Sequence, residues 1–370
     1  MKLAFLIFKY FPYGGVQRDM LRIARDCVAL GHEVTIFTGE WRGEQPANMR
    51  VQLLRARGWF NHQKHQSLIS QMQTAVHTGG FDRVVGFNRM PGLDVYFAAD
   101  PCYAARMQQE HWYKKLSGRY RFFSECEQAV FGPESGTHVL LLNQRDQAIF
   151  QHWYGTETAR FHLIPPNIPL QRFAELPAQD YPAYVRKAFG LPADALVLLT
   201  VGSAFVRKGV DRTIDALAAL PVPLRERTYL LAVGEFESAS NMPRYAQQRG
   251  VARQCIEAGG RPDVAALMRG CDLLVHAARS ELAGIVLIEA MTAGLPQLVT
   301  DVCGYAPYVA QAGAGQVLPT PFQQAQMNTA LADMLQRLPG APWSAQARQW
   351  VEQQAARQVA MPEARIICQP

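Results

Sequence analysis

Apolar and polar residues alternate with two different periods along the first half of the chain. Buried strands are predicted by short apolar runs at residues 3–8, 32–38, 83–87 and 138–143. Between the first two runs, at about residues 16–30, apolar side chains recur every three or four positions, which predicts a helix with one buried face. Strands that alternate with helices are typical of an α/β domain built on a parallel sheet.

The second half of the chain repeats this alternation after a proline-rich passage. That passage, at residues 164–169, contains three prolines and is typical of a rigid junction between domains. Predicted strands follow it at residues 196–202, 229–234, 256–258, 273–276 and 297–300. We therefore expect an N-terminal domain at 1–166 and a second domain at 167–342. The remaining segment, 343–370, contains a predicted helix long enough to return to the first domain.

Length and composition agree with two globular domains. The chain has 370 residues, and one hydrophobic core seldom organises so long a polypeptide. Hydrophobic residues make up 49% and charged residues 18%, so the chain is expected to fold throughout. No apolar stretch reaches the roughly 20 residues that cross a bilayer. Lys9 interrupts the first apolar run, which we interpret as a strand and not a signal peptide, and we predict a cytoplasmic protein.

Metal-binding patterns are missing from the sequence. The seven cysteines are scattered without CxxC spacing, which argues against a disulfide framework or a zinc site. No Asp-x-Asp pair occurs, and no cluster of His, Cys and carboxylate residues has metal-ligand spacing. We therefore predict neither a metal ion nor a bound cofactor.

One segment, residues 103–123, combines basic and aromatic residues within a chain of net charge +6. Its basic residues are Arg106, Lys114, Lys115, Arg119 and Arg121. Its later aromatic residues are Trp112, Tyr113, Tyr120, Phe122 and Phe123. Cations interleaved with aromatic rings suit a membrane surface. The first alternative is a solvated helix face with a few aromatic residues in the core. The second is a groove for nucleic acid, but the sequence contains no known nucleic-acid-binding module.

Two glutamates, Glu281 and Glu289, flank a predicted junction between a loop and a helix. Glu281 follows the buried strand at 273–276, and the helix at 285–293 contains Glu289. The unpaired amides at a helix start favour an anion such as phosphate. Here these amides belong to Gly284, Ile285 and Val286. The junction could present one carboxylate to a sugar, the amides to a phosphate, and the second carboxylate to a ribose.

Other candidate ligand contacts in the second half also follow predicted strands. Arg207 and Lys208 come after the strand at 196–202, and both cations are suited to phosphate oxygens. They could neutralise a diphosphate, or they could be a solvated pair at a helix start. Arg261 follows the strand at 256–258, where exposed backbone could contact the edge of a base.

In the first half, Gly14 and Gly15 open the predicted helix, so the backbone could approach a ligand closely there. The pattern is not GxGxxG, which argues against a nicotinamide cofactor and leaves an ordinary tight turn as the alternative. Asp19, in the first helical turn, could complement the helix dipole. Asp94 and Asp100 could each bind an acceptor hydroxyl, cap a helix or face water.

Three of these passages, at 164–167, 202–209 and 281–296, together resemble the retaining glycosyltransferases of the GT-B fold. The loop at 9–19 and the stretch at 86–100 are similar to those of lipopolysaccharide core glucosyltransferases, which add the first glucose to the inner-core heptose. The resemblance implies two Rossmann-like domains whose parallel sheets face each other across a cleft. It also implies that the second domain binds UDP-glucose, that the first binds the acceptor, and that transfer retains the anomeric configuration.

The resemblance also implies roles for the candidate residues of the second domain. Lys208 and Arg207 would stabilise the diphosphate, and Glu281 would contact the hexose hydroxyls. Glu289 would bind the ribose, and Arg261 the uracil. Backbone contacts to sugar and phosphate would come from Ala283, Gly284, Ile285 and Val286.

For the first domain, the resemblance implies that Gly15 and Asp19 complete the site. The implied catalytic residues are Glu281, Lys208 and Asp19. Acceptor contacts are predicted for Asp19, Asp94 and Asp100. One departure bears on the donor, because Ser203 stands where the family often has an Arg directly after the glycine of its phosphate loop.

The implied acceptor is a lipid-anchored saccharide, which favours the membrane interpretation of residues 103–123. We predict peripheral binding to the anionic cytoplasmic face of the inner membrane through Arg106, Trp112, Lys114, Lys115, Arg119 and Arg121, and no nucleic-acid partner. Two alternatives keep the fold, namely a transferase that uses another UDP-hexose and an enzyme of sugar-nucleotide epimerisation or phosphorolysis. A third alternative, of a different class, is a non-catalytic membrane adaptor that binds a nucleotide sugar.

Overall fold

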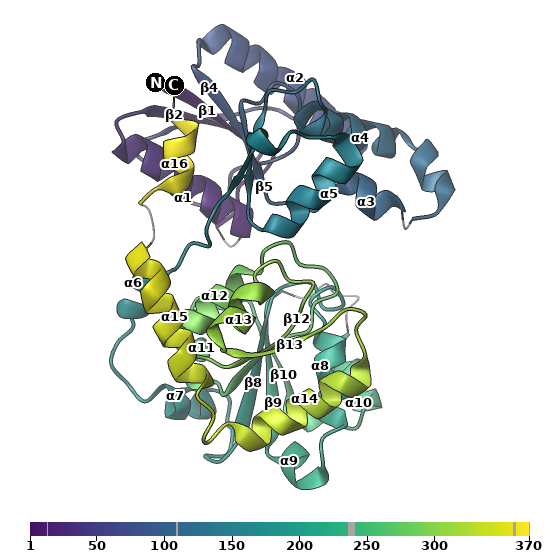
Figure 1. Cartoon of the computed structure of the whole chain (residues 1–370), viewed down its shortest axis with the longest axis vertical. Coiled ribbons are helices and arrows are strands. Elements are labelled where there is room, and N and C mark those ends of the chain that lie inside the picture. Colours follow the sequence, from purple (N-terminus) through teal and green to yellow (C-terminus); the bar gives the residue numbers. More distant parts are fainter. Residues whose placement is uncertain (13, 109, 236–240, 358–359, 370) are drawn as a thin grey trace. The chain divides into compact units, whose positions relative to one another are not determined.

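The computed structural model describes residues 1–12, 14–108, 110–235, 241–357 and 360–369. The chain forms two compact units (Figure 1). The first comprises Met1–Pro165 together with Val359–Pro370, and the second comprises Pro166–Gln358. Each unit has its own parallel sheet and its own hydrophobic core.

The first unit is built on a seven-stranded sheet with the strand order β3-β2-β1-β4-β5-β6-β7. All of its paired strands are parallel. In the central strand, Phe5 pairs in register with Ile36 on one side and with Val85 on the other. The strands are β1 (Lys2–Ile7), β2 (Glu33–Thr38), β3 (Arg50–Leu53), β4 (Arg83–Gly86), β5 (Val95–Ala98), β6 (His138–Leu141) and β7 (Phe161–Leu163).

Both faces of this sheet are buried because successive strand side chains point to opposite sides. Phe5 packs in one core with Met20 and Ile367, whereas Leu6 packs in the other with Leu68 and Phe131. The α-helices of the unit are α1 (Gly15–Ala29), α2 (Asn61–Gly79), α3 (Tyr103–Gln108), α4 (Gly118–Phe131), α5 (Gln144–Tyr154) and α16 (Pro362–Ile367). Two short 3-10 helices, η1 (Trp112–Leu116) and η2 (Thr158–Arg160), complete it.

The second unit is built on a six-stranded parallel sheet with the order β10-β9-β8-β11-β12-β13. Its strands are β8 (Leu196–Val201), β9 (Thr228–Val233), β10 (Cys255–Gly259), β11 (Leu273–His276), β12 (Gln297–Thr300) and β13 (Gly315–Leu318). The first five helices are α6 (Leu170–Ala174), α7 (Tyr181–Ala188), α8 (Val210–Ala218), α9 (Val222–Glu226) and α10 (Met242–Gln248). The others are η3 (Ala252–Gln254), α11 (Val264–Gly270), α12 (Ile285–Ala293), α13 (Ala306–Ala312), α14 (Gln324–Arg337) and α15 (Trp343–Arg357).

The two parallel-sheet units predicted from the apolar pattern are confirmed, as is the Rossmann-like architecture that the family resemblance implies. The pattern located α1 because Met20, Ile23 and Cys27 do form its buried face. It missed four strands, β3, β5, β7 and β13. Three of these, β3, β7 and β13, are edge strands that are only partly buried, so they lack the continuous apolar run of the central strands.

The segment after residue 342 differs from the single returning helix that we expected. It forms two helices, of which α15 lies in the second unit and α16 in the first. Helix α15 buries Trp343 and Trp350 and contacts α12 and α13, and this apolar face holds it to the second unit. Figure 1 shows the yellow α16 beside the purple α1, where Glu363 forms an ion pair with Arg22 at 2.6 Å.

No helix in the described part of the chain is both long enough and apolar enough to cross a bilayer.

Candidate active site

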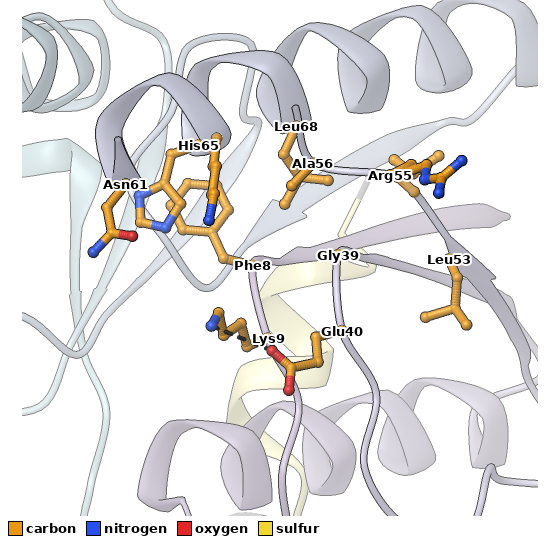
Figure 2. A pocket seen from close by; sticks show the side chains of 12 residues that line it. Phe8, Lys9, Gly39, Glu40, Leu53, Arg55, Ala56, Asn61, His65 and Leu68 are labelled. Atoms are coloured by element: carbon orange, nitrogen blue, oxygen red, sulfur yellow. Dashed lines mark ion pairs between the residues drawn. The ribbon is translucent and has the colours of Figure 1, made fainter. Parts of the chain in front are cut away.

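A pocket opens in the first unit where three neighbouring strands end (Figure 2). Its walls come from the loops after β1, β2 and β3 and from the first turns of α2, and its volume is about 510 Å³. Ligands of parallel sheets bind at the carboxyl ends of strands, so this pocket has the usual position of a ligand site. None of the residues predicted to form the site lines it.

In the second unit, the loop after β8 and the loop after β11 bring two predicted catalytic residues into contact. The ammonium of Lys208 forms an ion pair with the carboxylate of Glu281, although the two residues are 73 positions apart. Both side chains are largely buried, with exposed fractions of 13% and 14%. Arg207 lies further out, with its Nη1 3.5 Å from Oε2 of Glu281 and its side chain 52% exposed. The strand order explains the contact, because β8 and β11 are neighbours in the sheet.

Backbone geometry fixes the position of Lys208. The next residue, Gly209, has a φ of +71° and directly precedes α8. A Cβ atom at Gly209 would lie 1.9 Å from the carbonyl oxygen of Ala277, so only glycine fits there. The two loops therefore approach each other as closely as their backbones allow.

The Glu281 carboxylate is ionised in this setting. Burial opposes the charged form, but neighbouring His276 and Lys208 outweigh it and lower the pKa of Glu281 to about 2. His276, the last residue of β11, is completely buried, and burial lowers the pKa of its imidazole. Glu281 therefore faces one ammonium ion and one neutral ring. Sequence reasoning missed His276, because a histidine inside an apolar strand gives no signal of its own.

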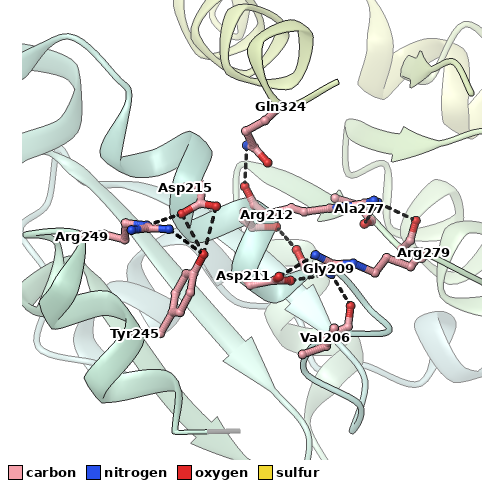
Figure 3. A network of polar contacts seen from close by, with 12 residues as sticks. Val206, Gly209, Asp211, Arg212, Asp215, Tyr245, Arg249, Ala277, Arg279 and Gln324 are labelled. Atoms are coloured by element: carbon pink, nitrogen blue, oxygen red, sulfur yellow. Dashed lines mark hydrogen bonds and ion pairs between the residues drawn. The ribbon is translucent and has the colours of Figure 1, made fainter. Parts of the chain in front are cut away.

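A polar network braces the same two loops (Figure 3). The guanidinium of Arg279 donates two hydrogen bonds of 2.7 Å to Asp211 and a third to the carbonyl oxygen of Val206. Its backbone amide also donates to the carbonyl oxygen of Arg207, at 2.8 Å. Arg279 thus ties the loop that carries Lys208 to the loop that carries Glu281. No local sequence pattern indicates this residue, since its partners lie 68 to 73 positions away.

The start of α12 has the geometry that an anion site requires. Gly284 precedes the helix with a φ of +85°, and no acidic residue lies in the first turn. The first amides of a helix lack partners within it, so those at Ile285 and Val286 face outward at the positive end of the dipole. The carbonyl oxygen of Ala283 accepts a hydrogen bond of 2.8 Å from the amide of Tyr305, which fixes the preceding loop.

Two predicted nucleotide contacts are engaged in ion pairs. Glu289 lies buried in α12, and Oε1 of its carboxylate is 2.5 Å from Nη1 of Arg172. Arg261 forms a two-point ion pair with Asp263, which also accepts a hydrogen bond of 2.9 Å from Tyr184. Each side chain is thus already oriented by a neighbour.

Gly15 and Asp19 lie in the first turns of α1, in the first unit. A Cβ atom at Gly15 would meet nothing within 4 Å, so the backbone is open to a ligand there. The Asp19 carboxylate is 3.5 Å from Arg22, which also holds Glu363 of α16. Burial raises the pKa of Asp19 although the charge of Arg22 opposes that rise.

The other two predicted acceptor aspartates, Asp94 and Asp100, lie at opposite ends of β5. Asp94 precedes β5, and its carboxylate accepts a hydrogen bond of 2.7 Å from the amide of Val84 at the start of β4. This is the amino end of the sheet, away from the usual ligand side, so its position does not support an acceptor role. Asp100 follows β5 at the carboxyl end and is exposed, and its carbonyl oxygen accepts a hydrogen bond of 2.6 Å from Arg89.

The basic aromatic segment is divided between surface and core. Trp112 and Tyr113 of η1 are 73% and 55% exposed. Phe122 of α4 is buried in the core. The predicted membrane contacts Arg106, Lys114, Lys115, Arg119 and Arg121 are all exposed. The surface interpretation therefore fits the first part of the segment, and the core interpretation fits Phe122.

Among the described residues, no three His, Cys, Asp or Glu side chains gather in a group that could hold a metal ion.

Comparison with known proteins identifies the family. The group 1 glycosyltransferase family matches residues 184–352. The lipopolysaccharide glucosyltransferase WaaG of Escherichia coli (strain K12) is 42% identical over 357 residues, which are 96% of this chain and 95% of that protein. This chain belongs to the WaaG family of lipopolysaccharide glucosyltransferases. The resemblance predicted from the loops is thereby confirmed.

Solved structures agree with this assignment. The crystal structure of WaaG, a glycosyltransferase involved in lipopolysaccharide biosynthesis, has a TM-score of 0.93 and 40% identity, and all of both chains is covered. This match confirms the GT-B fold. The Anabaena protein Alr3699/HepE in complex with UDP and glucose has a TM-score of 0.73 over 98% of this chain and 97% of its own. At 18% identity it shares the fold alone.

Proposed function

We propose that this glycosyltransferase transfers glucose from UDP-glucose to the inner-core heptose of lipopolysaccharide, with retention of the anomeric configuration. The observation that carries the proposal is the buried contact between Lys208 and Glu281 at the carboxyl ends of β8 and β11. In this proposal Lys208 is the cation for the leaving phosphate, and Glu281 is the carboxylate for the sugar hydroxyls. The membership of the WaaG family supports the same reaction.

Each half of this pair suits one part of the donor. A buried ammonium forms strong charge-assisted hydrogen bonds with phosphate oxygens, and Lys208 has three N–H donors of which Glu281 needs one. Glu281 stays ionised down to a pH of about 2, so it accepts hydrogen bonds from hexose hydroxyls at any physiological pH. Glu289 would bind the ribose and Arg261 the uracil once the nucleotide competes with their present partners.

The reaction needs charge stabilisation more than proton transfer by the protein. An acceptor hydroxyl oxygen forms a bond to the anomeric carbon while the bond from that carbon to the diphosphate oxygen breaks on the same face. The hydroxyl proton passes to the departing phosphate oxygen. Lys208, Arg207 and the amides of Gly284, Ile285 and Val286 stabilise the charge that develops on UDP, as preorganised donors. No metal ion is required in this scheme. Gly15, Asp19 and Asp100 would contact the substrates from the first unit.

We propose in addition that η1 and its neighbours bind the anionic cytoplasmic face of the inner membrane. The exposed apolar side chains of Trp112, Tyr113 and Leu116 stand among the exposed cations Lys115 and Arg119. Aromatic rings and cations together favour the interface of an anionic bilayer. Sedimentation with vesicles that contain phosphatidylglycerol should show binding that the Trp112→Ser variant weakens, whereas equal binding would contradict the proposal.

The decisive experiment offers the purified enzyme a panel of UDP-sugars and a heptose-terminated lipopolysaccharide acceptor, without added metal. We expect UDP release that depends on UDP-glucose, with a matching gain of one hexose in the acceptor mass. Lys208→Ala and Glu281→Gln should lose this turnover while they remain folded by circular dichroism. Turnover with another UDP-hexose alone would change the donor assignment. Binding of nucleotide sugars without any turnover would support an adaptor instead.

A further inference from the structure

We propose that the pocket at the ends of β1, β2 and β3 binds a negatively charged group of the acceptor saccharide, either a phosphate ester or a sugar-acid carboxylate. This inference rests on the proposed function, because it names the chemistry by which the first unit selects its acceptor. The pocket has a polar rim, an aromatic wall and two exposed cations, Arg55 and Lys64, that pair with no described residue, and each of these features supports a different part of the proposal (Figure 2).

The charge of the lining is positive. Lys9, Arg55 and Lys64 contribute three positive charges and Glu40 one negative charge, which gives a net charge of 3 − 1 = +2. Glu40 is already engaged by Lys9 at 3.2 Å and by Arg42 at 2.6 Å. The guanidinium of Arg55 and the ammonium of Lys64 have no hydrogen bond or ion pair with any described side chain or backbone group. These two cations at the rim are therefore available to an incoming anion.

The helix at the pocket wall adds to this positive potential. Helix α2 runs for 19 residues from Asn61, and its first turn contains no acidic side chain. Gln63 accepts hydrogen bonds from the amides of Trp59 and Phe60, so those two are satisfied locally. Asn61, at the first position of the helix, lines the pocket. The positive end of the helix dipole thus lies at the same rim as Lys64.

Another part of the pocket lining is aromatic, and this part suits a sugar ring. The imidazole of His65 stacks on Phe8, with ring centroids 4.3 Å apart. Burial lowers the pKa of His65, and its Nδ1 is buried without a hydrogen-bond partner among the described groups. A neutral imidazole stacked on Phe8 forms an aromatic surface against which the apolar face of a sugar ring can pack. A saccharide that carries one anionic substituent therefore matches both sides of the pocket.

The surroundings favour a substrate that is anchored in a bilayer. Trp59 and Phe60, which directly precede the lining residue Asn61, are 94% and 65% exposed. Helix α2 contacts α4, and α4 contacts η1, which carries the exposed Trp112. Exposed aromatic residues thus lie both at the proposed membrane contact and beside the pocket. A saccharide on a lipid anchor could reach the pocket from there.

The test compares acceptors in solution, so that the membrane does not contribute. Lipid-free core oligosaccharide is prepared in three forms: intact, treated with phosphatase, and with its carboxylates reduced. We expect the wild-type enzyme to have a KM about tenfold lower for the intact form than for the form that lacks the recognised anion. The double variant Arg55→Gln, Lys64→Gln should lose that preference. The control Lys187→Gln, Arg253→Gln removes the same charge from exposed positions of the second unit and should keep it.

The outcomes separate the proposal from the function on which it rests. If the wild-type enzyme transfers glucose and the pocket variant keeps the full preference, the inference is wrong and the proposed function stands. If no acceptor is glucosylated, the proposed function fails, and calorimetric binding of the intact oligosaccharide to wild type and variant still tests the pocket. Loss of binding to anionic vesicles, with an unchanged acceptor preference, would assign the pocket to lipid headgroups and overturn the inference.

Discussion

Nε2 of His276 lies 3.6 Å from Oε2 of Glu281, and both nitrogens of this fully buried ring lack a hydrogen-bond partner among the described groups. The separation is slightly longer than a hydrogen bond, so a small movement of Glu281 would either form the bond or break the contact. Glu281 is therefore held between a direct ion pair with Lys208 and a neutral imidazole. The position of the Glu281 carboxylate therefore depends on His276, a buried residue that need not contact the substrate.

The buried imidazole should make stability depend on pH. Because burial lowers the folded-state pKa of His276 below its ordinary 6.5, the unfolded chain binds the proton more readily. Stability is then complete above about pH 6.5 and falls as the pH decreases from there. Calorimetry should show a smaller decrease in Tm between pH 7.5 and 5.5 for His276→Asn than for the wild type, equivalent to at most about 1.4 kcal/mol per pH unit. Parallel curves for the two proteins would contradict this assignment.

The two cations after β8 should contribute unequally to turnover. Lys208 is buried and contacts Glu281 directly, whereas Arg207 is half exposed and its charge is screened by water. We expect Lys208→Ala to lower kcat/KM by about 10²- to 10³-fold, the usual loss for one preorganised donor. Arg207→Ala should lower kcat/KM by about tenfold or less, because water screens the charge of this exposed side chain. Steady-state kinetics with UDP-glucose measure both, and a larger loss for Arg207 would reverse the proposed roles.

Arg279 should act on the reaction by positioning the loops. Its side chain joins Asp211 to the carbonyl oxygen of Val206 and forms no hydrogen bond or ion pair with a described side chain that is predicted to bind sugar or phosphate (Figure 3). We expect Arg279→Met to lower kcat/KM and Arg279→Lys to restore it in part. The double variant Asp211→Asn, Arg279→Met should lower kcat/KM little more than either single variant does. This corresponds to a coupling energy between the two residues of about 0.5 to 3 kcal/mol. Additive losses in this double-mutant cycle would show that the two residues act independently.

The buried Glu127 should stabilise the start of the basic aromatic segment. Its carboxylate is completely buried, pairs with Arg89 at 2.6 Å and accepts hydrogen bonds from the amides of Tyr103 and Ala104. Glu127→Gln would leave Arg89 buried without a counter-charge, a loss of about 3 to 5 kcal/mol. Urea denaturation followed by circular dichroism measures the change. Glu125→Gln, at an exposed position of the same helix, is the matched control, and equal stabilities of the two variants would disprove the role.

The amino-acid sequence by itself determined the elements with a long apolar signal. Residues 273–276 and 285–293 were predicted with the bounds that β11 and α12 have, because a continuous apolar run and a following glycine define them locally. The residues of the family's loops, Lys208 and Glu281 among them, were also evident, because loops that follow strands carry the ligand contacts of α/β sheets.

Only the tertiary structure decided which side chains meet. Glu289 and Arg172 are 117 positions apart, and Arg22 and Glu363 are 341 apart, so no local pattern could predict either ion pair. The same is true of the pocket, whose walls come from three strand ends and one helix. Local periodicity reports only which face of an element is buried. The order of strands in the sheet brings distant residues together, and that order depends on packing of the whole unit.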